Sequence, residues 1–239
     1  MKGPLLRILR SSVFRKQVVA ITGLAMVGFI IAHLSGNLLI FGGPDTFNAY
    51  AHSIAKLGAL LWVMRFGLLA AVALHIWLTI SLVRENRRAR GSRYYEQRSH
   101  GEHRWLMQTM IYSGLLIVFF LLIHLNDFTF ADKTGSNSVI SGYNNDESLE
   151  LFGVVWNSYN SGIGFLPGWA RVALYLLAMG AVGLHLSHAI QSVFQTFGFN
   201  HPRYTPIIRL VSVGLGVIVA IGFASIPILI ALAPEPFGV

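Results

Sequence analysis

Five long apolar segments restrict the fold of this chain more than any other feature of its sequence. They lie at residues 18–41, 58–83, 106–129, 170–194 and 206–232. Each holds about 20 or more mainly apolar residues, which is the length that an α-helix needs to cross a bilayer. Charged residues make up only 12% of the chain, against about 25% in soluble domains. We therefore expect an all-α membrane protein in which residues 1–239 form a single membrane domain of five transmembrane helices.

The basic N-terminus, MKGPLLRILRSSVFRK, resembles the start of a signal peptide. The apolar run that follows is too long for the core of such a peptide, and it has no clear small-residue cleavage site. We expect this run to be retained as the first transmembrane helix.

Lysine and arginine gather on one side of the predicted spans. They are Lys2, Arg7, Arg10, Arg15 and Lys16 before the first span, Arg84, Arg87, Arg88, Arg90, Arg93, Arg98 and Arg104 after the second, and Arg203 and Arg209 around the start of the fifth. The other side has only Lys56 and Lys133, with Arg65 and Arg171 near helix ends. Short cytoplasmic loops carry the excess of lysine and arginine. This predicts a cytoplasmic N-terminus and an outer C-terminus, and it explains the net charge of +8 without nucleic-acid binding.

A polar outer loop is expected at residues 130–169. Within it, the segment SLELFGVVWNSYN predicts a short helix at the membrane interface, with Trp156 and Tyr159 as its anchors. No repeat of fixed period stands out along the chain.

The chain has nine histidines and no cysteine. The lack of cysteine excludes disulfides, thiolate-bound iron–sulfur clusters and covalent haem of the CxxCH type. His52, His100, His103 and His201 fall in loops or at helix edges, where solvated side chains are expected. The other five, His33, His75, His124, His185 and His188, fall in the predicted spans. Ionisable residues inside a membrane are costly and are usually functional.

Four of these histidines are predicted to lie at two depths, because an α-helix rises about 1.5 Å per residue. His33 and His124 lie roughly 25 and 28 Å from the cytoplasmic ends of their spans. His75 and His185 lie roughly 14 Å from the same side, on helices that run the opposite way. Each of the first four helices therefore supplies one histidine, two at each level.

Two histidines at one level match the needs of a haem iron, which takes two axial ligands such as neutral imidazole. We expect two bis-histidine haems, an outer one between His33 and His124 and an inner one between His75 and His185. A hydrogen bond to a neighbouring helix explains any single histidine equally well, but it does not explain two matched depths. A structural zinc ion requires four ligands at one site, whereas these histidines are predicted to form two pairs at separate depths. A histidine proton relay would need buried acids, of which the spans hold almost none.

The segments around these histidines resemble the five-helix, two-haem cytochrome b membrane anchor of succinate:quinone oxidoreductases, the succinate dehydrogenase and fumarate reductase group. The resemblance extends over nearly the whole chain. It is carried by GFIIAHLSGNLLIFGGPDTFNAYAH, LWVMRFGLLAAVALHIWLTISLVRENRRARGSRY, SGLLIVFFLLIHLNDFTF and GLHLSHAIQSVFQTFG. By position, the family's four haem ligands fall on His33, His75, His124 and His185. The resemblance implies a four-helix haem-binding core with a fifth, peripheral helix.

The same resemblance implies what the chain does. It would anchor a flavoprotein subunit and an iron–sulfur subunit on the cytoplasmic face of a bacterial inner membrane, and it would have no dicarboxylate site of its own. Its two b haems would pass electrons between the iron–sulfur subunit and a membrane quinone, which is commonly menaquinone in bacteria with this subunit. Some fumarate reductases of the group carry a proton-moving glutamate two residues before the fourth ligand, where this chain has Gly183. The alternatives are the cytochrome b subunit of a formate or hydrogen dehydrogenase, and a haem-free transporter or anchor.

Further residues are candidates for supporting roles. Haem propionates want cationic or hydrogen-bonding partners, and the candidates are Arg15, Lys16 and Arg84 at the inner haem and Arg65 and Arg171 at the outer one. Each is explained as well by a long side chain that reaches from a helix end to the interface. His188 lies one helical turn beyond His185, so we expect it to support the inner haem or a quinone site there without binding iron, or to bond to a neighbouring helix.

Quinone chemistry moves protons together with electrons, so it needs a protonatable or hydrogen-bonding group near a haem. Asp127, Asn48 and Asp45 are the candidates on the outer side. Asp127 is preferred because it follows His124 by three residues. Helix capping and turn formation are the competing explanation, and we favour that explanation for Asp45.

Overall fold

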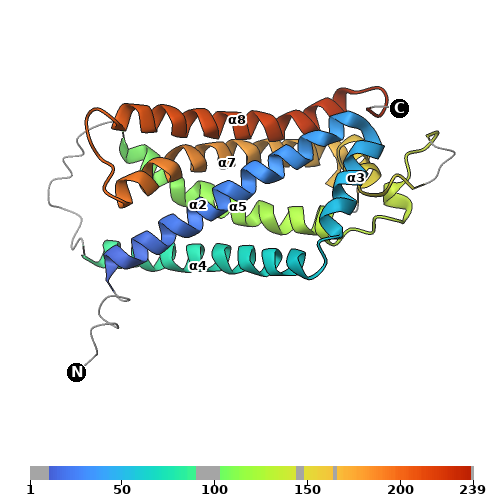
Figure 1. Cartoon of the computed structure of the whole chain (residues 1–239). Coiled ribbons are helices and arrows are strands. Elements are labelled where there is room, and N and C mark those ends of the chain that lie inside the picture. Colours follow the sequence, from blue (N-terminus) through green and yellow to red (C-terminus); the bar gives the residue numbers. More distant parts are fainter. Residues whose placement is uncertain (1–10, 90–102, 144–147, 164–165, 238–239) are drawn as a thin grey trace.

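Five long helices form an elongated bundle in the computed structural model of the chain (Figure 1), which describes residues 11–89, 103–143, 148–163 and 166–237. They are α2 (Ser12–Asn37), α4 (Ala59–Ala89), α5 (His103–His124), α7 (Gly168–Thr196) and α8 (Thr205–Leu232). All five helices are long and apolar enough to cross a membrane, and α5 is so together with the turn that follows it. The architecture is therefore that of a multi-pass, all-α membrane protein.

The helices extend past the predicted apolar runs. α2 begins six residues earlier than predicted, because the Ser11 hydroxyl accepts a hydrogen bond from the backbone N–H of Phe14 at 3.2 Å and so caps the first turn. α4 continues to Ala89 through the arginines that follow its apolar part, because arginine has a high helix propensity. The fourth and fifth predicted spans differ from α7 and α8 by at most two residues at either end.

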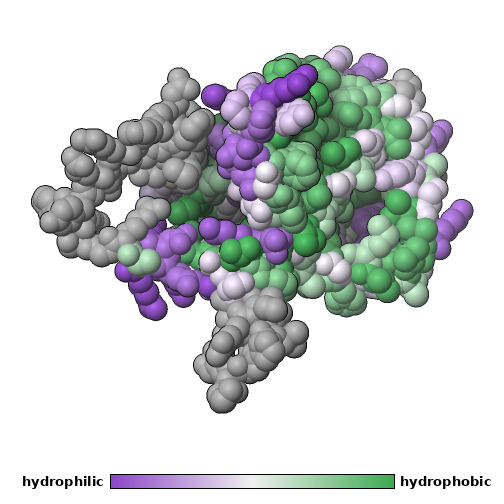
Figure 2. Space-filling view, turned by 60° about the vertical axis from the view of Figure 1, so that its left-hand side comes forward, coloured by the Kyte–Doolittle hydropathy of each residue, from purple (hydrophilic) through white to green (hydrophobic). Residues whose placement is uncertain are grey.

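One end of the bundle, called the basic end here, carries Arg15, Lys16, Arg84, Arg87, Arg88, Arg203 and Arg209. α2, α5 and α8 begin there, and α4 and α7 end there (Figure 1). Figure 2 shows hydrophobic side chains over the flank of the bundle and hydrophilic ones gathered beside the grey segments. The predicted cations Lys2, Arg7, Arg10, Arg90, Arg93 and Arg98 lie outside the described residues, as does the side chain of Arg104.

Short elements cover the opposite end, called the α6 end here. They are η1 (Leu38–Gly42), α3 (Gly43–Ala55), the π-helical turn η2 (Leu125–Thr129), η3 (Ser136–Ser138), α6 (Glu150–Asn160) and the antiparallel pair β1 (Gly162–Ile163) and β2 (Leu166–Pro167). The predicted short helix in the outer loop is thus confirmed as α6. π-Helical turns occur often at functional sites, and η2 follows His124 directly.

The prediction that Trp156 and Tyr159 anchor α6 at the membrane interface is wrong. Their side chains are only 4% and 5% exposed, and they belong to the main hydrophobic core. α6 packs on α3 and on the ends of α7 and α8, so its aromatic face is turned into the protein. The sequence pattern alone does not distinguish burial against helix ends from burial against lipid, since both require an apolar face.

The long helices pack in a defined order. α2 packs against α4 and α7, α5 packs against α7, and α8 packs along α7 and also contacts α2. The backbones of α7 and α8 approach closely at Gly183, where a Cβ atom would lie 2.9 Å from the carbonyl oxygen of Gly216 and 2.8 Å from the Cβ of Ala220. Small residues allow such close contact between membrane helices. A larger side chain at position 183 therefore has no room.

Candidate histidine site

His33 and His124 face each other near the α6 end of the bundle. His33 lies in the last turns of α2, and His124 is the last residue of α5. Their ring centres are 5.8 Å apart and the rings are perpendicular. A metal–imidazole bond is about 2 Å long and the ring centre lies about 1.2 Å beyond the nitrogen, so two imidazoles that held one metal between them would have ring centres about 6 Å apart. The spacing of this pair therefore suits two ligands on one iron.

Aromatic rings surround this pair. Phe29 stacks on His33 with ring centres 5.2 Å apart, and Phe223 of α8 lies 5.7 Å from the same ring. Phe120 and Phe128 lie 5.4 and 5.3 Å from the ring of His124. Most of the side chains around the pair are thus flat and apolar, as the binding of a porphyrin-sized ligand requires. One of them, Phe223, comes from α8, which carries none of the four histidines.

A buried ion pair lies beside His124. Nε of Arg171 donates to Oδ2 of Asp127 at 3.0 Å, and its NH2 group donates to Oδ1 at 3.2 Å. The two side chains are 2% and 4% exposed. Arg171 also donates to the backbone carbonyls of Leu166 and Ile163 at 3.3 and 2.9 Å. The guanidinium predicted as a propionate partner is therefore bound by the protein itself.

Two tyrosines extend this polar group. The Tyr175 hydroxyl donates to Oδ2 of Asp127 at 3.0 Å and lies 3.5 Å from Nδ1 of His124. Tyr159 forms a hydrogen bond with Tyr175. Burial above all, and the nearby Asp127 carboxylate, raise the pKa of the Tyr159 phenol well above its usual value, so this phenol stays neutral. Arg171, Asp127 and the tyrosines form one network that reaches the histidine.

His75 of α4 and His185 of α7, the predicted inner pair, lie nearer the basic end. Each ring lies against a glycine on a neighbouring helix: a Cβ atom at Gly23 would be 3.4 Å from Cε1 of His75, and one at Gly114 would be 3.5 Å from Cε1 of His185. The two rings are close enough for the charge of one to act on the other. His188 lies on the same helix, one turn beyond His185, and is a second electrostatic neighbour of it.

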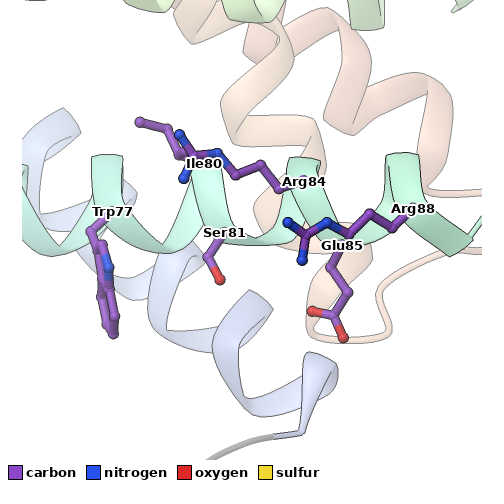
Figure 3. Close-up of a pocket in the computed structure, with 6 residues that line it drawn as sticks. All are labelled: Trp77, Ile80, Ser81, Arg84, Glu85 and Arg88. Carbon is purple, nitrogen blue, oxygen red and sulfur yellow. The ribbon is translucent and has the colours of Figure 1, made fainter.

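The predicted propionate partners at the basic end have different surroundings. Arg15 of α2 forms an ion pair with Glu85 of α4 and donates to Ser81 at 3.1 Å, while its Nε is buried without a partner among the described residues. Lys16 is exposed. Arg84 lines a cavity of about 430 Å³ on α4, together with Trp77, Ile80, Ser81, Glu85 and Arg88. Figure 3 shows the side chains of Arg84 and Arg88 extending along α4 in the direction of Trp77, while Trp77, Ser81 and Glu85 point downward in the view.

The predicted quinone candidates do not share one environment. Both carboxylate oxygens of Asp127 are bound by Arg171. The side chain of Asn48 joins α3 to α6, since it donates to the Leu149 carbonyl at 3.0 Å and accepts from the Phe152 N–H at 3.1 Å. Asp45 is exposed in the first turn of α3, where a negative charge favours the helix. Arg65, predicted near the outer haem, lies over the ring of Trp62 on its own helix.

Several residues of the site were not predicted from the sequence. Tyr175 follows Arg171 by four positions on α7, a spacing that places two side chains on one helix face. Tyr159 was expected only as an interface anchor. Thr22 and Ser113, whose hydroxyls lie 3.2 Å from Nδ1 of His75 and of His185, were missed because each lies in an ordinary apolar context. Among the residues that the structure describes, no group of three or more His, Cys, Asp or Glu side chains is placed to hold a metal ion.

Comparison of the chain with protein-family models, with curated proteins and with solved structures finds no match. The function is therefore inferred from the residues of the chain itself.

Proposed function

We propose that this chain is the di-haem cytochrome b anchor subunit of a succinate:quinone oxidoreductase. In that role it binds two b haems, holds a flavoprotein and an iron–sulfur subunit at the membrane, and exchanges electrons between the iron–sulfur subunit and a quinone such as menaquinone. The single observation that carries the proposal is the presence of two histidine pairs, with one histidine from each of four membrane-spanning helices.

The donor set suits haem. Imidazole is a good axial ligand for haem iron, and both pairs offer it from opposite helices in apolar surroundings. The rings of His33 and His124 are spaced for two ligands on one iron, and glycines leave room beside the rings of His75 and His185. When bound, two such haems supply one-electron transfer between two levels of the membrane.

The remaining residues act around the ligands. Phe29, Phe120 and Phe223 exclude water from the His33–His124 pair. The buried ion pair of Arg171 and Asp127 fixes the π-helical turn that follows His124. Because the Tyr175 hydroxyl joins Asp127 to His124, this network is also the best candidate for hydrogen-bonding contact with a quinone at the α6 end.

The proposed orientation follows from charge. The basic end faces the cytoplasm under the positive-inside rule, and it is the end at which the flavoprotein and iron–sulfur subunits dock. The C-terminus, α3 and α6 then lie on the outer face of a bacterial inner membrane. The described arginines Arg84 and Arg88 beside the cavity on α4 provide a basic surface for an acidic partner or for lipid headgroups.

Electron transfer here is proposed to lack the proton path of the glutamate-bearing relatives. Position 183 is glycine, and the backbone and side chains of α8 occupy the space that a longer side chain would need. Substitution to glutamate would therefore separate α7 from α8 before it supplied a proton carrier.

Purification of the chain from its native membrane, with the subunits that remain bound, tests this function. We expect a flavin-bearing and an iron–sulfur partner, and succinate-dependent reduction of a menaquinone analogue by the complex. Activity with formate or hydrogen and none with succinate would instead assign the chain to another membrane dehydrogenase. A purified chain without haem or redox partner would favour a haem-free transporter or anchor.

A further inference from the structure

The first two histidine helices and the last two repeat one arrangement. Residues 22–33 of α2 read TGLAMVGFIIAH, and residues 113–124 of α5 read SGLLIVFFLLIH. Both begin with a hydroxyl residue and a glycine, and both end with a histidine at the same spacing. Residues 71–75 of α4 read AVALH, and residues 181–185 of α7 read AVGLH. In the structure α2 packs on α4 and α5 packs on α7, so the chain contains two similar helical hairpins.

In the first hairpin, α2 holds the ring of His75. Nδ1 of His75 lies 3.1 Å from the carbonyl oxygen of Val19 and 3.2 Å from the hydroxyl of Thr22. The Thr22 hydroxyl donates its own proton to a backbone carbonyl of its helix, at 2.8 Å to Val18, so it accepts from the ring. Gly23 brings the backbone of α2 against the edge of the same ring.

In the second hairpin, α5 holds the ring of His185 in the same way. Nδ1 of His185 lies 3.2 Å from the hydroxyl of Ser113, and the ring forms a hydrogen bond with the backbone of Met110. The Ser113 hydroxyl donates to the Met110 carbonyl at 3.2 Å, so it too accepts from the ring. Gly114 takes the place that Gly23 has in the first hairpin.

These contacts fix where the proton of each imidazole lies. The Val19 carbonyl oxygen can only accept from Nδ1 of His75. The Ser113 hydroxyl, whose proton is donated to Met110, accepts from Nδ1 of His185, so Nδ1 carries the proton in both rings. A neutral imidazole has one N–H, which leaves the lone pair on Nε2. The hydrogen bonds described above for His75 with Val19 and Thr22, and for His185 with Ser113, all involve Nδ1 and leave Nε2 unused. The His33–His124 pair differs, because its ring nitrogens lie near an amide of Asn37 and a phenol of Tyr175.

We propose that Thr22 and Ser113 are positioning residues that orient His75 and His185 with Nε2 toward the iron, and so set the properties of the haem at this pair. The inference rests on the proposed function, since it concerns haem binding. It extends that function by giving α2 and α5 a second role. Each of these helices carries a proposed ligand of the His33–His124 haem, and each also supplies one hydroxyl that supports a ligand of the other haem. The Nδ1 hydrogen bond also makes the imidazole more electron-rich, which favours oxidised iron.

The test uses Thr22→Val and Ser113→Ala, singly and together, in the full chain. Loss of such a supporting hydrogen bond weakens metal binding by about tenfold to a hundredfold. We expect the double variant to lose the haem at the His75–His185 pair preferentially on washing with a haem-binding competitor. In the single variants, we expect the reduction potential of that haem to rise. The component is identified as the one that His75→Ala lacks. Thr22→Ser should restore the wild-type potential.

Ser187→Ala is the matched control. Its hydroxyl bonds to the carbonyl of Gly183 on its own helix at 2.7 Å and faces Gly216 of α8, away from the ring of His185. This variant should change neither haem. Equal shifts in both haems, or no shift in either, would overturn the inference while leaving the proposed function intact. A wild-type chain that binds no haem would overturn both.

Discussion

Replacing His33 with alanine is expected to abolish one of two b-type haem signals and to leave the other. His124→Ala should remove the same signal, because the two rings face each other at 5.8 Å and are proposed to bind one iron. His75→Ala and His185→Ala should each remove the remaining signal. The effect is all-or-none at each site, since an iron that loses one of two axial ligands loses its bis-histidine spectrum. Redox-resolved optical spectra of the purified variants measure this pattern.

His201→Ala is the control for these substitutions, because His201 is exposed next to the start of α8 and should leave both signals. His188→Ala checks the assignment within α7. Loss of a haem in His188→Ala but not in His185→Ala would show that the two residues have been exchanged as ligands. Loss of both signals from each single variant would contradict the separation into two pairs.

Replacing Asp127 with alanine is expected to destabilise the protein by about 3–5 kcal/mol, because it leaves the buried Arg171 guanidinium without its counter-charge. Arg171→Ala should cost a similar amount for the converse reason. The double substitution Asp127→Leu with Arg171→Met should cost less than either, since it buries no charge. Thermal unfolding of the chain in one detergent compares the three variants. Loss of the ion pair should also disturb the proposed haem at His124 more than the one at His75, because the Tyr175 hydroxyl connects Asp127 to His124.

The ion pair of Arg15 and Glu85 provides a matched comparison at the basic end. The Glu85 side chain is 54% exposed, and exposed pairs contribute only about 0–1 kcal/mol. Glu85→Ala should therefore have a small effect. If Asp127→Ala unfolded at the same temperature as Glu85→Ala, the ion pair beside His124 would not have the structural role described here.

Hydropathy is enough to predict the five spans, because a helix needs about 20 apolar residues to cross a bilayer. The predicted levels of the histidines depend on the fixed rise of an α-helix and stay predictions. The rings of His33 and His124 lie together in the structure, and their binding of one haem iron stays a prediction. Where the chain turns back on itself, the same reasoning is weaker. Trp156 and Tyr159 are apolar enough for either a lipid interface or a protein core, and only the fold of α6 onto α7 and α8 places them in the core.

The supporting contacts could not be predicted from local sequence. Asp127 and Arg171 are ordinary helix-end residues until η2 and the start of α7 bring them together. The contacts of Thr22 and Ser113 with His75 and His185 form only because the helices that carry these histidines pack against α2 and α5. The repeat that connects them has no fixed period, because the connection within the second hairpin is longer than that within the first. The shared signal is a hydroxyl residue and a glycine at one spacing before a histidine, on two separate helices.

The haem content of the purified wild-type chain tests the central claim most directly. Haem per chain, together with a redox titration of the optical spectrum, should give two b haems and two low-spin components with bis-histidine character. A chain that is folded but binds no haem, or that binds a single haem lost equally on substitution of His33 and of His75, would contradict the account.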